Sequence, residues 1–360
     1  MKVRAIALYL PQFHPTPEND IWWGKGFTEW TNVGKAKPLF RGHEQPKVPA
    51  DLGYYDLRLP DVRKAQAELA RQYGIEGFCY WHYWFGNGRK LLDRPFHEVL
   101  CSGEPDFPFC LAWANHSWKK KLWNPDGKGD EILIEQNYLG DEDYIAHFYD
   151  VLPAFKDSRY ITIDSKPVFF VFAPFDSPEI KRFIELWRVL AVENGLNGIY
   201  FVGQADIVYK QKVLELGFDA INNVSMLAVF TRQSKLRWFL QQCVMRLLQR
   251  PRIYAYSAAM KYFSCDEDSE MDTIPSVYPN WDHTPRSGLK GIVLKGSTPV
   301  LFKKQVKIAL KRIKDKPEEH RLLIIKSWNE WGEGNYMEPD LKYGCSYLQA
   351  FKDAISEEEF

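Results

Sequence analysis

The sequence predicts a single (β/α)8 barrel, and three observations carry this prediction. Short apolar runs that are typical of buried strands occur eight times and alternate with amphipathic helical segments. A chain of 360 residues has the length of one such barrel. Polar and aromatic residues recur directly after the runs, at ends that share one face of a barrel. The alternative is a doubly wound open sheet, but the sequence has neither a Gly-x-Gly-x-x-Gly motif nor a phosphate loop.

The strands are predicted from runs that are rich in β-branched and aromatic residues. They are Val3–Leu10, Gly77–Phe85, Phe107–Ala114, Pro167–Phe172, Ile199–Val202, Phe218–Asn222, Ile274–Tyr278 and Leu322–Lys326. Helices are predicted from apolar positions at helical spacing, between residues that start and stop helices. They are Asp61–Tyr73, Tyr144–Leu152, Glu179–Asn194, Thr298–Lys314 and Tyr347–Ser356.

A long aromatic segment follows the first strand and contains Trp22, Trp23, Phe27, Glu29 and Trp30. Loops of this length without secondary structure are either functional or disordered, and this one is too aromatic for disorder. We therefore expect it to form a wall of the binding cleft.

Composition argues against several classes of function. Lys plus Arg and Asp plus Glu both number 47, so no net charge points to nucleic acid. The aromatic content of 15% favours a site that binds by stacking. The six cysteines form no Cys-x-x-Cys pair, and Asp282-His283 has no third ligand at recognisable spacing. We expect no metal, no cofactor and no nucleic-acid partner.

The N-terminal residues enter the first strand without the apolar core of a signal peptide, and no apolar run is long enough to span a bilayer. These features predict a cytoplasmic protein with reduced thiols.

Two glutamates, Glu330 and Glu333, follow the last strand and alternate with Trp328 and Trp331. Paired carboxylates can act as acid and base on a glycosidic bond, while aromatic faces stack on sugar rings. A spacing of three places both carboxylates on one side only if the segment turns helically, which Gly332 favours. The acid needs a raised pKa, and desolvation by Trp331 is expected to supply it. A solvated loop with core tryptophans is the alternative.

Residues 224–265 are predicted to form a basic insertion, and no acidic residue occurs from Ala220 to Cys265. An amphipathic helix is expected near 235–250, where apolar residues recur at helical spacing. Two interpretations stay open. The helix packs on the barrel, or residues 232–252 contact an anionic membrane surface or a lipid-linked glycan, which would make the protein peripheral to the inner membrane.

Motifs from the first strand to the last resemble the WbsX family. They are Tyr9–His14, Trp22–Trp30, Gly77–Trp84, Val277–Asp282 and Trp328–Gly334. That family occurs in bacterial O-antigen and capsule clusters and is usually labelled as glycosyltransferases. It is similar in turn to glycoside hydrolase family 99, which contains endo-α-mannosidases and endo-α-mannanases with a (β/α)8 fold.

The resemblance implies roles for the carboxylates. Glu330 would be the base that deprotonates the sugar 2-hydroxyl, giving a 1,2-anhydro intermediate and retention. Glu333 would be the general acid and then the base for the acceptor, and Glu338 would support the pair. Gly332 departs from the hydrolases, which carry a larger residue there, and this leaves hydrolysis and transfer both open.

Other polar and aromatic residues at strand ends and in the aromatic segment are expected to bind substrate. With the supporting glutamate they are His14, Trp23, Glu29, Trp30, Trp81, His82, Tyr83, Asn115, Trp118, Asn280, Trp281, Asn329, Trp331 and Glu338. A structural role is the alternative for the histidines, and Glu29 is equally open.

The predicted function is a retaining endo-glycosidase or transglycosylase that acts on a bacterial surface polysaccharide or its precursor. A glycosyltransferase that uses an activated donor is the second hypothesis, and a non-catalytic glycan-binding barrel is the third. The lack of a nucleotide-binding Gly-rich loop argues against the transferase, while the lack of a signal peptide favours it.

Overall fold

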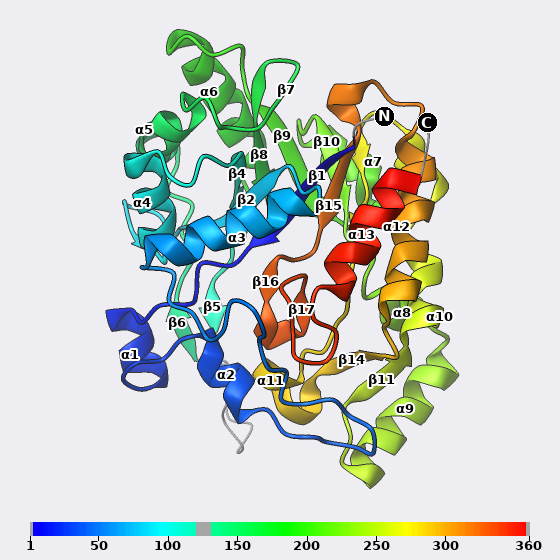
Figure 1. Cartoon of the computed structure of the whole chain (residues 1–360). Coiled ribbons are helices and arrows are strands. Elements are labelled where there is room, and N and C mark those ends of the chain that lie inside the picture. Colours follow the sequence, from blue (N-terminus) through cyan, green and yellow to red (C-terminus); the bar gives the residue numbers. More distant parts are fainter. Residues whose placement is uncertain (1–2, 120–130, 358–360) are drawn as a thin grey trace.

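A ring of parallel strands forms the centre of the computed structural model, which describes residues 3–119 and 131–357 (Figure 1). The strand order is β12-β10-β9-β8-β4-β2-β1-β15-β13. Only Pro275 separates β12 from β13, and these two pair with β10 and β15 respectively. The chain therefore closes the ring at this residue. Proline has no backbone N–H to donate to a ladder, which explains why the seventh strand is divided here.

All eight predicted strands are confirmed, with ends that differ by a few residues. The ring strands are β1 (Arg4–Tyr9), β2 (Gly77–Trp84), β4 (Phe109–Trp113), β8 (Lys166–Val171), β9 (Tyr200–Ala205), β10 (Ala220–Asn223), β12 (Thr273–Ile274), β13 (Ser276–Val277) and β15 (Leu322–Ile325). β2, β4 and β15 are buried along their whole length, as expected for parallel strands covered on both faces. The (β/α)8 fold class is therefore confirmed.

Helices alternate with these strands and cover the outside of the ring (Figure 1). The five predicted helices are confirmed as α3 (Pro60–Gln72), α5 (Asp141–Phe155), α6 (Ile180–Glu193), α12 (Pro299–Ile313) and α13 (Ser346–Glu357). The remaining helices are α1 (Pro17–Trp23), α2 (Glu29–Lys35), α4 (Arg94–Ser102), α7 (Lys210–Glu215), α8 (Ala228–Thr231), α9 (Lys235–Leu248), α10 (Tyr256–Ala259) and α11 (Thr284–Ser287).

The aromatic segment after β1 was predicted to lack secondary structure, and this is wrong. It contains α1 and α2, whose N-terminal threonines satisfy backbone N–H groups. The Thr16 side chain accepts from the backbone N–H of Asn19, and Thr28 begins a capping box with Thr31. Such caps stabilise short helices that have little apolar periodicity of their own.

Short strands outside the ring lie in the segments that connect the ring strands and helices. They are β3 (Lys90–Leu91), β5 (Trp118–Lys119), β6 (Ile132–Ile134), β7 (Thr162–Ile163), β11 (Arg252–Ala255), β14 (Ile292–Lys295), β16 (Asn329–Glu330) and β17 (Asn335–Tyr336). The hairpin of β16 and β17 follows β15 and lies in the lower half of Figure 1 with α2 and α11. Loops that follow parallel strands meet at the carboxyl end of a barrel, so this half carries the candidate site.

The basic insertion lies on the same end of the barrel and includes the predicted helix, α9 (Figure 1). A separate hydrophobic cluster joins the insertion to the barrel, with Tyr254, Tyr256 and Phe263 packed around Tyr278 and Trp281. The interpretation that the apolar side of α9 packs on the barrel is wrong, because those side chains face solvent. Within the described residues, none of the helices is both long and apolar enough to cross a membrane.

Candidate active site

The predicted glutamate pair lies in a cleft at the carboxyl end of the ring. Glu330 ends β16, and Glu333 ends a single helical turn, Trp331–Glu333. Gly334 follows in the left-handed region with φ of 55°, which turns the chain into β17. A Cβ at Gly334 would lie 2.8 Å from the Cβ of Asp282, so the close approach of these two loops also requires glycine. The helical turn places both carboxylates on one side.

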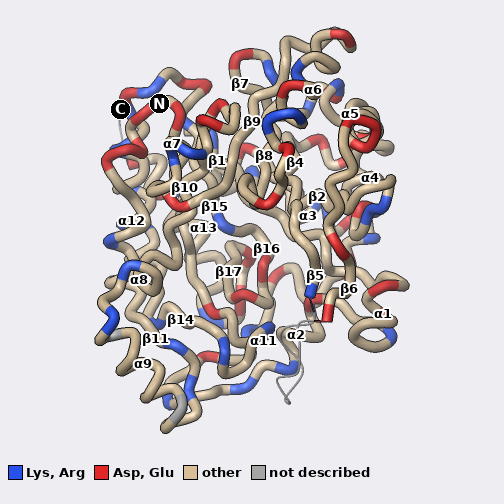
Figure 2. The backbone as a smooth tube through the Cα atoms, turned by 180° about the vertical axis from the view of Figure 1, so that it is seen from behind, with Lys and Arg blue, Asp and Glu red and all other residues tan. Residues whose placement is uncertain are grey.

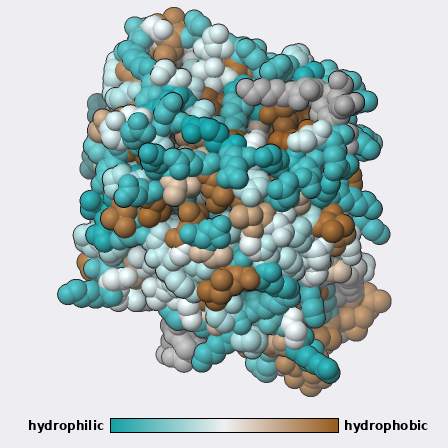
Figure 3. Space-filling model, in the orientation of Figure 1, coloured by the Kyte–Doolittle hydropathy of each residue, from teal (hydrophilic) through white to brown (hydrophobic). Residues whose placement is uncertain are grey.

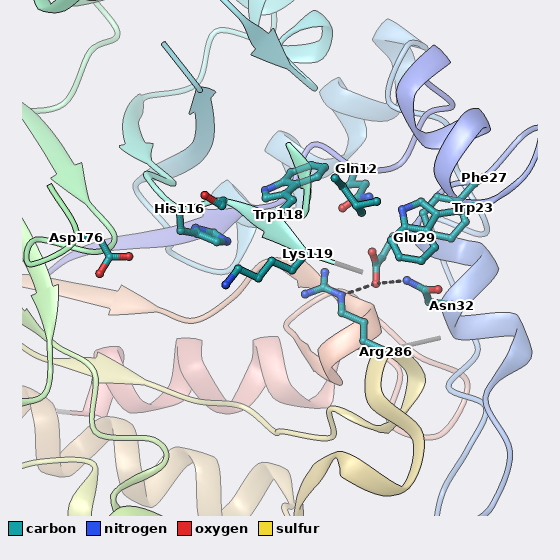
Figure 4. A pocket seen from close by; sticks show the side chains of 12 residues that line it. Gln12, Trp23, Phe27, Glu29, Asn32, His116, Trp118, Lys119, Asp176 and Arg286 are labelled. Atoms are coloured by element: carbon teal, nitrogen blue, oxygen red, sulfur yellow. Dashed lines mark hydrogen bonds and ion pairs between the residues drawn. The ribbon is translucent and has the colours of Figure 1, made fainter. Parts of the chain in front are cut away.

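Two cavities form the cleft. One, of about 410 Å³, is lined by both glutamates together with Trp81, Tyr83 and Trp281. The other, of about 550 Å³, is lined by residues from the aromatic segment and from the loop after β4. The two cavities are adjacent, because four residues line both of them: Gln12, His116, Trp118 and Arg286. Figure 4 shows the second cavity, with Trp23 and Phe27 on one side and His116 and Trp118 on the other.

Arg286 links three carboxylates at the floor of the cleft. Its Nη1 lies 2.5 Å from Glu333 Oε1 and 3.8 Å from Glu330 Oε1. Its Nε lies 2.9 Å from Oε1 of Glu29, the first residue of α2 (Figure 4). Burial opposes the charge of the guanidinium, but Glu29, Glu333 and Glu330 raise the pKa of Arg286 above its ordinary value. The group therefore stays cationic.

The two glutamates have opposite electrostatic surroundings. Burial, followed by repulsion from Glu333, raises the pKa of Glu330, and the Ser327 hydroxyl donates to Glu330 Oε2 at 2.9 Å. Burial also opposes ionisation of Glu333, but Arg286 and then His283 hold the pKa of Glu333 below its ordinary value. We expected the raised pKa at Glu333, and this is wrong. Sequence spacing cannot show which carboxylate an arginine from another loop will contact.

Gly332 is small because Glu29 occupies the space beside it. A Cβ at this position would lie 1.6 Å from Glu29 Oε1 and 3.1 Å from Arg286 Nε. The departure from the hydrolase pattern at Gly332 is therefore matched by the ion pair of Glu29 and Arg286. These residues together form one wall of the site.

A buried layer supports the glutamate pair from below. Glu338 accepts from the Tyr55 hydroxyl at 2.9 Å, from Gln66 Nε2 at 2.7 Å and from Trp331 Nε1 at 2.6 Å. Burial, only partly offset by these donors, raises the pKa of Glu338 to about 7. The Trp331 ring stacks on Tyr336 with centroids 3.8 Å apart. Glu338 and Trp331 thus fix the turn that carries Glu333.

Asn329 ties this turn to the first strand. Its side chain accepts from the backbone N–H of Leu10 at 2.7 Å and donates to the carbonyl of Leu10 at 3.0 Å. Both groups are buried. An amide that pairs with a donor and an acceptor of the same residue acts as a fixed clamp. Its geometry is that of a positioning residue.

The structure brings only part of the predicted binding set to the cleft. Trp23, Glu29, Trp81, Tyr83, Trp118 and Trp281 line the two cavities. Asn280 lines a separate cavity of about 300 Å³, on the other side of Trp281.

The other predicted residues lie outside these cavities, and all of them are buried except Trp30, which is partly buried. His82 and His147 approach to 2.8 Å between their Nε2 atoms. Asn115 bonds to the backbone of Ala173. Trp30 Nε1 donates to the carbonyl of Tyr55. His14, near Pro11, is 2% exposed and lines none of the described cavities.

Several cleft residues were missed by the sequence reasoning, above all Arg286. It lies in the short helix α11 beyond the seventh strand, and a single arginine in a loop carries no local signal. The sequence predicted Lys326 only as the end of the last strand. Its side chain is buried, and its Nζ lies 6.0 Å from the Trp81 ring centroid. Its position at a strand end was the available signal.

Comparison with known proteins agrees with this architecture. The family model described as "Glycosyltransferase WbsX" matches residues 5–351. The uncharacterized protein WxcX of Xanthomonas campestris pv. campestris, found in strains ATCC 33913 and B100, is 35% identical over 364 residues. These matches cover 98% of this chain and 49% of the relatives, so the chain spans about half their length.

Solved structures share the fold at low identity. The GH99 endo-alpha-mannosidase from Bacteroides thetaiotaomicron aligns with a TM-score of 0.58 and 14% identity, covering 98% of this chain and 97% of that one. A protein described as glycoside hydrolase-like has the same TM-score and identity, covering 98% and 94%. The family match over residues 5–351 shows that this protein belongs to the family described as "Glycosyltransferase WbsX".

Proposed function

We propose that this protein cleaves and transfers glycosidic bonds of a bacterial surface polysaccharide or its precursor, with Glu330 and Glu333 as the catalytic pair. The observation that carries the proposal is the position of both carboxylates in an aromatic cavity that adjoins a second aromatic cavity at Trp118 and Arg286. An extended cleft suits a chain of sugars, and aromatic walls suit sugar rings. This geometry supports endo action.

The spacing of the pair supports retention of configuration. Because Nη1 of Arg286 lies 2.5 Å from Glu333 Oε1 and 3.8 Å from Glu330 Oε1, these two oxygens lie at most about 6.3 Å apart. Retaining glycosidases hold their carboxyl groups roughly 5–5.5 Å apart, whereas inverting ones need roughly 6.5–9.5 Å. The limit that Arg286 sets on the two oxygens accommodates the retaining separation, which is the arrangement that we propose.

The roles implied by the family resemblance require a change of charge in the site. In the unliganded site Glu333 is ionised beside Arg286, and the raised pKa of Glu330 favours the proton there. For Glu330 to act as base and Glu333 as acid, a bound sugar must weaken the contact between Glu333 and Arg286. Such a rearrangement on binding is the first step of the proposed mechanism.

A glycosyltransferase is the second candidate, and Arg286 is the observation that favours it. A leaving phosphate needs no proton, so transfer from a sugar-phosphate donor does not require a protonated Glu333 as general acid. A guanidinium also matches the geometry of phosphate oxygens. In this reading Arg286 exchanges a carboxylate for the phosphate of the donor.

The first experiment follows product formation by the purified protein on bacterial and mannose-type oligosaccharides, each with and without nucleotide sugars. Cleavage or chain rearrangement without nucleotide supports the first candidate, whereas product only with a nucleotide sugar supports the second. Both require loss in Glu330→Gln and Glu333→Gln, with Glu135→Gln as the control because Glu135 is exposed outside the cleft. A glycan-binding barrel without activity predicts binding but no product in any variant.

A second experiment separates the roles of the two glutamates. A glycosyl fluoride needs little assistance from an acid, because fluoride leaves easily. Glu333→Gln is therefore expected to regain turnover on a fluoride donor, and Glu330→Gln is not. Rescue of Glu330→Gln alone would reverse the assignment.

A further inference from the structure

Helix α9 presents a continuous apolar stripe to solvent. Five residues at helical spacing are at least half exposed: Leu236 (70%), Phe239 (59%), Leu240 (54%), Val244 (50%) and Leu247 (83%). Figure 3 shows brown side chains gathered at the lower right, where α9 lies in Figure 1. A helix that packs on a core turns this stripe inward. Here the stripe has no cover within the described residues.

The side of α9 that faces the protein is more polar. Gln241 accepts from the Tyr254 hydroxyl at 2.6 Å, and Gln241, Gln242 and Met245 are half-buried. The orientation is therefore fixed by a hydrogen bond and by contact with the insertion. The outward apolar stripe is a property of the packed helix.

Cationic residues stand at the start of α9 and directly after its end, and a further one lies later in the insertion. Lys235, Arg250 and Lys261 are exposed, and the sequence has no Asp or Glu between Ala220 and Cys265 (Figure 2). Arg232 is excluded from this set because it forms an ion pair with Asp206. The side chains of Arg237 and Arg246 lie outside the described part of the structure. The surface is thus apolar in the middle and basic at its borders.

Helix α9 and its exposed apolar stripe lie at the same end of the barrel as the candidate site. The insertion follows β10, so it lies at the carboxyl end of the barrel with the glutamate pair. Figure 1 places α9 at the lower edge, on the same half as β16, β17 and α11. A flat surface that holds α9 would therefore lie close to the end at which the cleft opens.

We propose that α9 docks this protein onto an anionic lipid bilayer, lying in the plane of the headgroups. The apolar stripe enters the interface, and Lys235, Arg250 and Lys261 contact anionic headgroups. Interfacial helices combine an aromatic and aliphatic face with a basic border and modest overall hydrophobicity, which is the pattern of α9. Charge complementarity favours a lipid surface over a second copy of the chain, which would bring like charges together. The proposal does not depend on which glycosidic reaction the cleft performs.

Flotation with vesicles tests the proposal. Vesicles of equal parts phosphatidylglycerol and phosphatidylethanolamine are expected to bind the protein, and phosphatidylcholine vesicles are not. The pair Lys235→Glu and Arg250→Glu is expected to weaken binding by roughly thirtyfold or more. The pair Leu240→Ser and Leu247→Ser is expected to weaken it by at least roughly tenfold.

Matched controls use Val192 on α6 and Val300 on α12, which are 64% and 77% exposed. Their change to serine is expected to leave vesicle binding intact. Binding to neither vesicle, equal binding to both, or equal loss in these controls would overturn the proposal. A dimer in sedimentation velocity that dissociates in the α9 leucine variants would also overturn it, in favour of a second copy as the occupant.

Discussion

The contact between Gly332 and Glu29 makes a strong prediction about stability. An alanine usually stabilises a site by about 0.4–1 kcal/mol when it replaces a glycine of ordinary backbone conformation. At Gly332 the added Cβ would lie 1.6 Å from Glu29 Oε1 and 2.7 Å from its Cδ, so the carboxyl group must move. Glu29 is 1% exposed and its Oε1 accepts from Arg286 Nε at 2.9 Å, so a movement of the carboxyl group disturbs that ion pair. We therefore expect Gly332→Ala to destabilise the protein.

The magnitude follows from the ion pair that is lost. Separating Glu29 from Arg286 breaks a buried pair, which costs about 3–5 kcal/mol and exceeds the gain from alanine. Scaled by the unfolding entropy of 360 residues, this lowers Tm by roughly 4–7 °C. Gly34→Ala in α2 is the control, because a Cβ there would meet nothing within 4 Å. Its Tm is expected to stay unchanged or rise slightly.

A double-mutant cycle identifies the cause. Unfolding midpoints are measured by tryptophan fluorescence for Gly332→Ala in the natural chain and in Glu29→Ala. If the clash with the Glu29 carboxylate is responsible, the alanine costs less than about 1 kcal/mol when that carboxylate is absent. Equal costs in both backgrounds would refute the reasoning, because they would place the strain in the turn itself.

Three further predictions concern buried polar groups. The pKa of Glu338 is raised to about 7, so protonated Glu338 contributes fully to the stability of the folded protein below about pH 4.5. This contribution is lost as the pH rises through 7. The loss of stability is about 3 kcal/mol. We expect Tm of the natural chain to fall between pH 5 and 8 for this reason, and Tm of Glu338→Gln to lack this decrease. Burial lowers the pKa of His82 to about 4, so stability is instead lost as the pH falls from about 6.5 through 4. His82→Gln should remove that slope in acid titrations followed by circular dichroism, and an unchanged slope would exclude His82 as its source. Asn329→Ala leaves the N–H and C=O of Leu10 unpaired and should cost about 2–5 kcal/mol in urea unfolding, whereas a loss below 1 kcal/mol would show that water replaces the clamp.

Much of the fold could be predicted because local patterns determine it. Buried parallel strands are short apolar runs, and the eight runs proved sufficient to define the ring. The division of the seventh strand at Pro275 could also be predicted, because proline has no backbone N–H to donate to the hydrogen bonds of a central strand. The helices α1 and α2 were missed although Thr16-Pro17 and Thr28-Glu29 are recognisable starting signals.

The site was less predictable because its chemistry depends on contacts between distant loops. Strand-end position correctly indicated that Glu330 and Glu333 lie together. It gave no information on Arg286, which lowers the pKa of Glu333 and so reverses the expected order of the two pKa values. Periodicity likewise predicted the stripe of α9 but not its direction, because a stripe has the same spacing whether it faces a core or solvent.

The assembly of the site from both ends of the chain has a consequence during synthesis. Glu29 and Arg286 are separated by 257 positions, and Asn329 reaches across 319 positions to Leu10. Because a ribosome releases the N-terminal part first, the nascent chain holds its aromatic segment long before it holds Glu330 and Glu333. Contacts between such distant positions also form late in folding. A partly synthesised chain therefore cannot assemble the complete candidate site until the residues that follow β15 have been made.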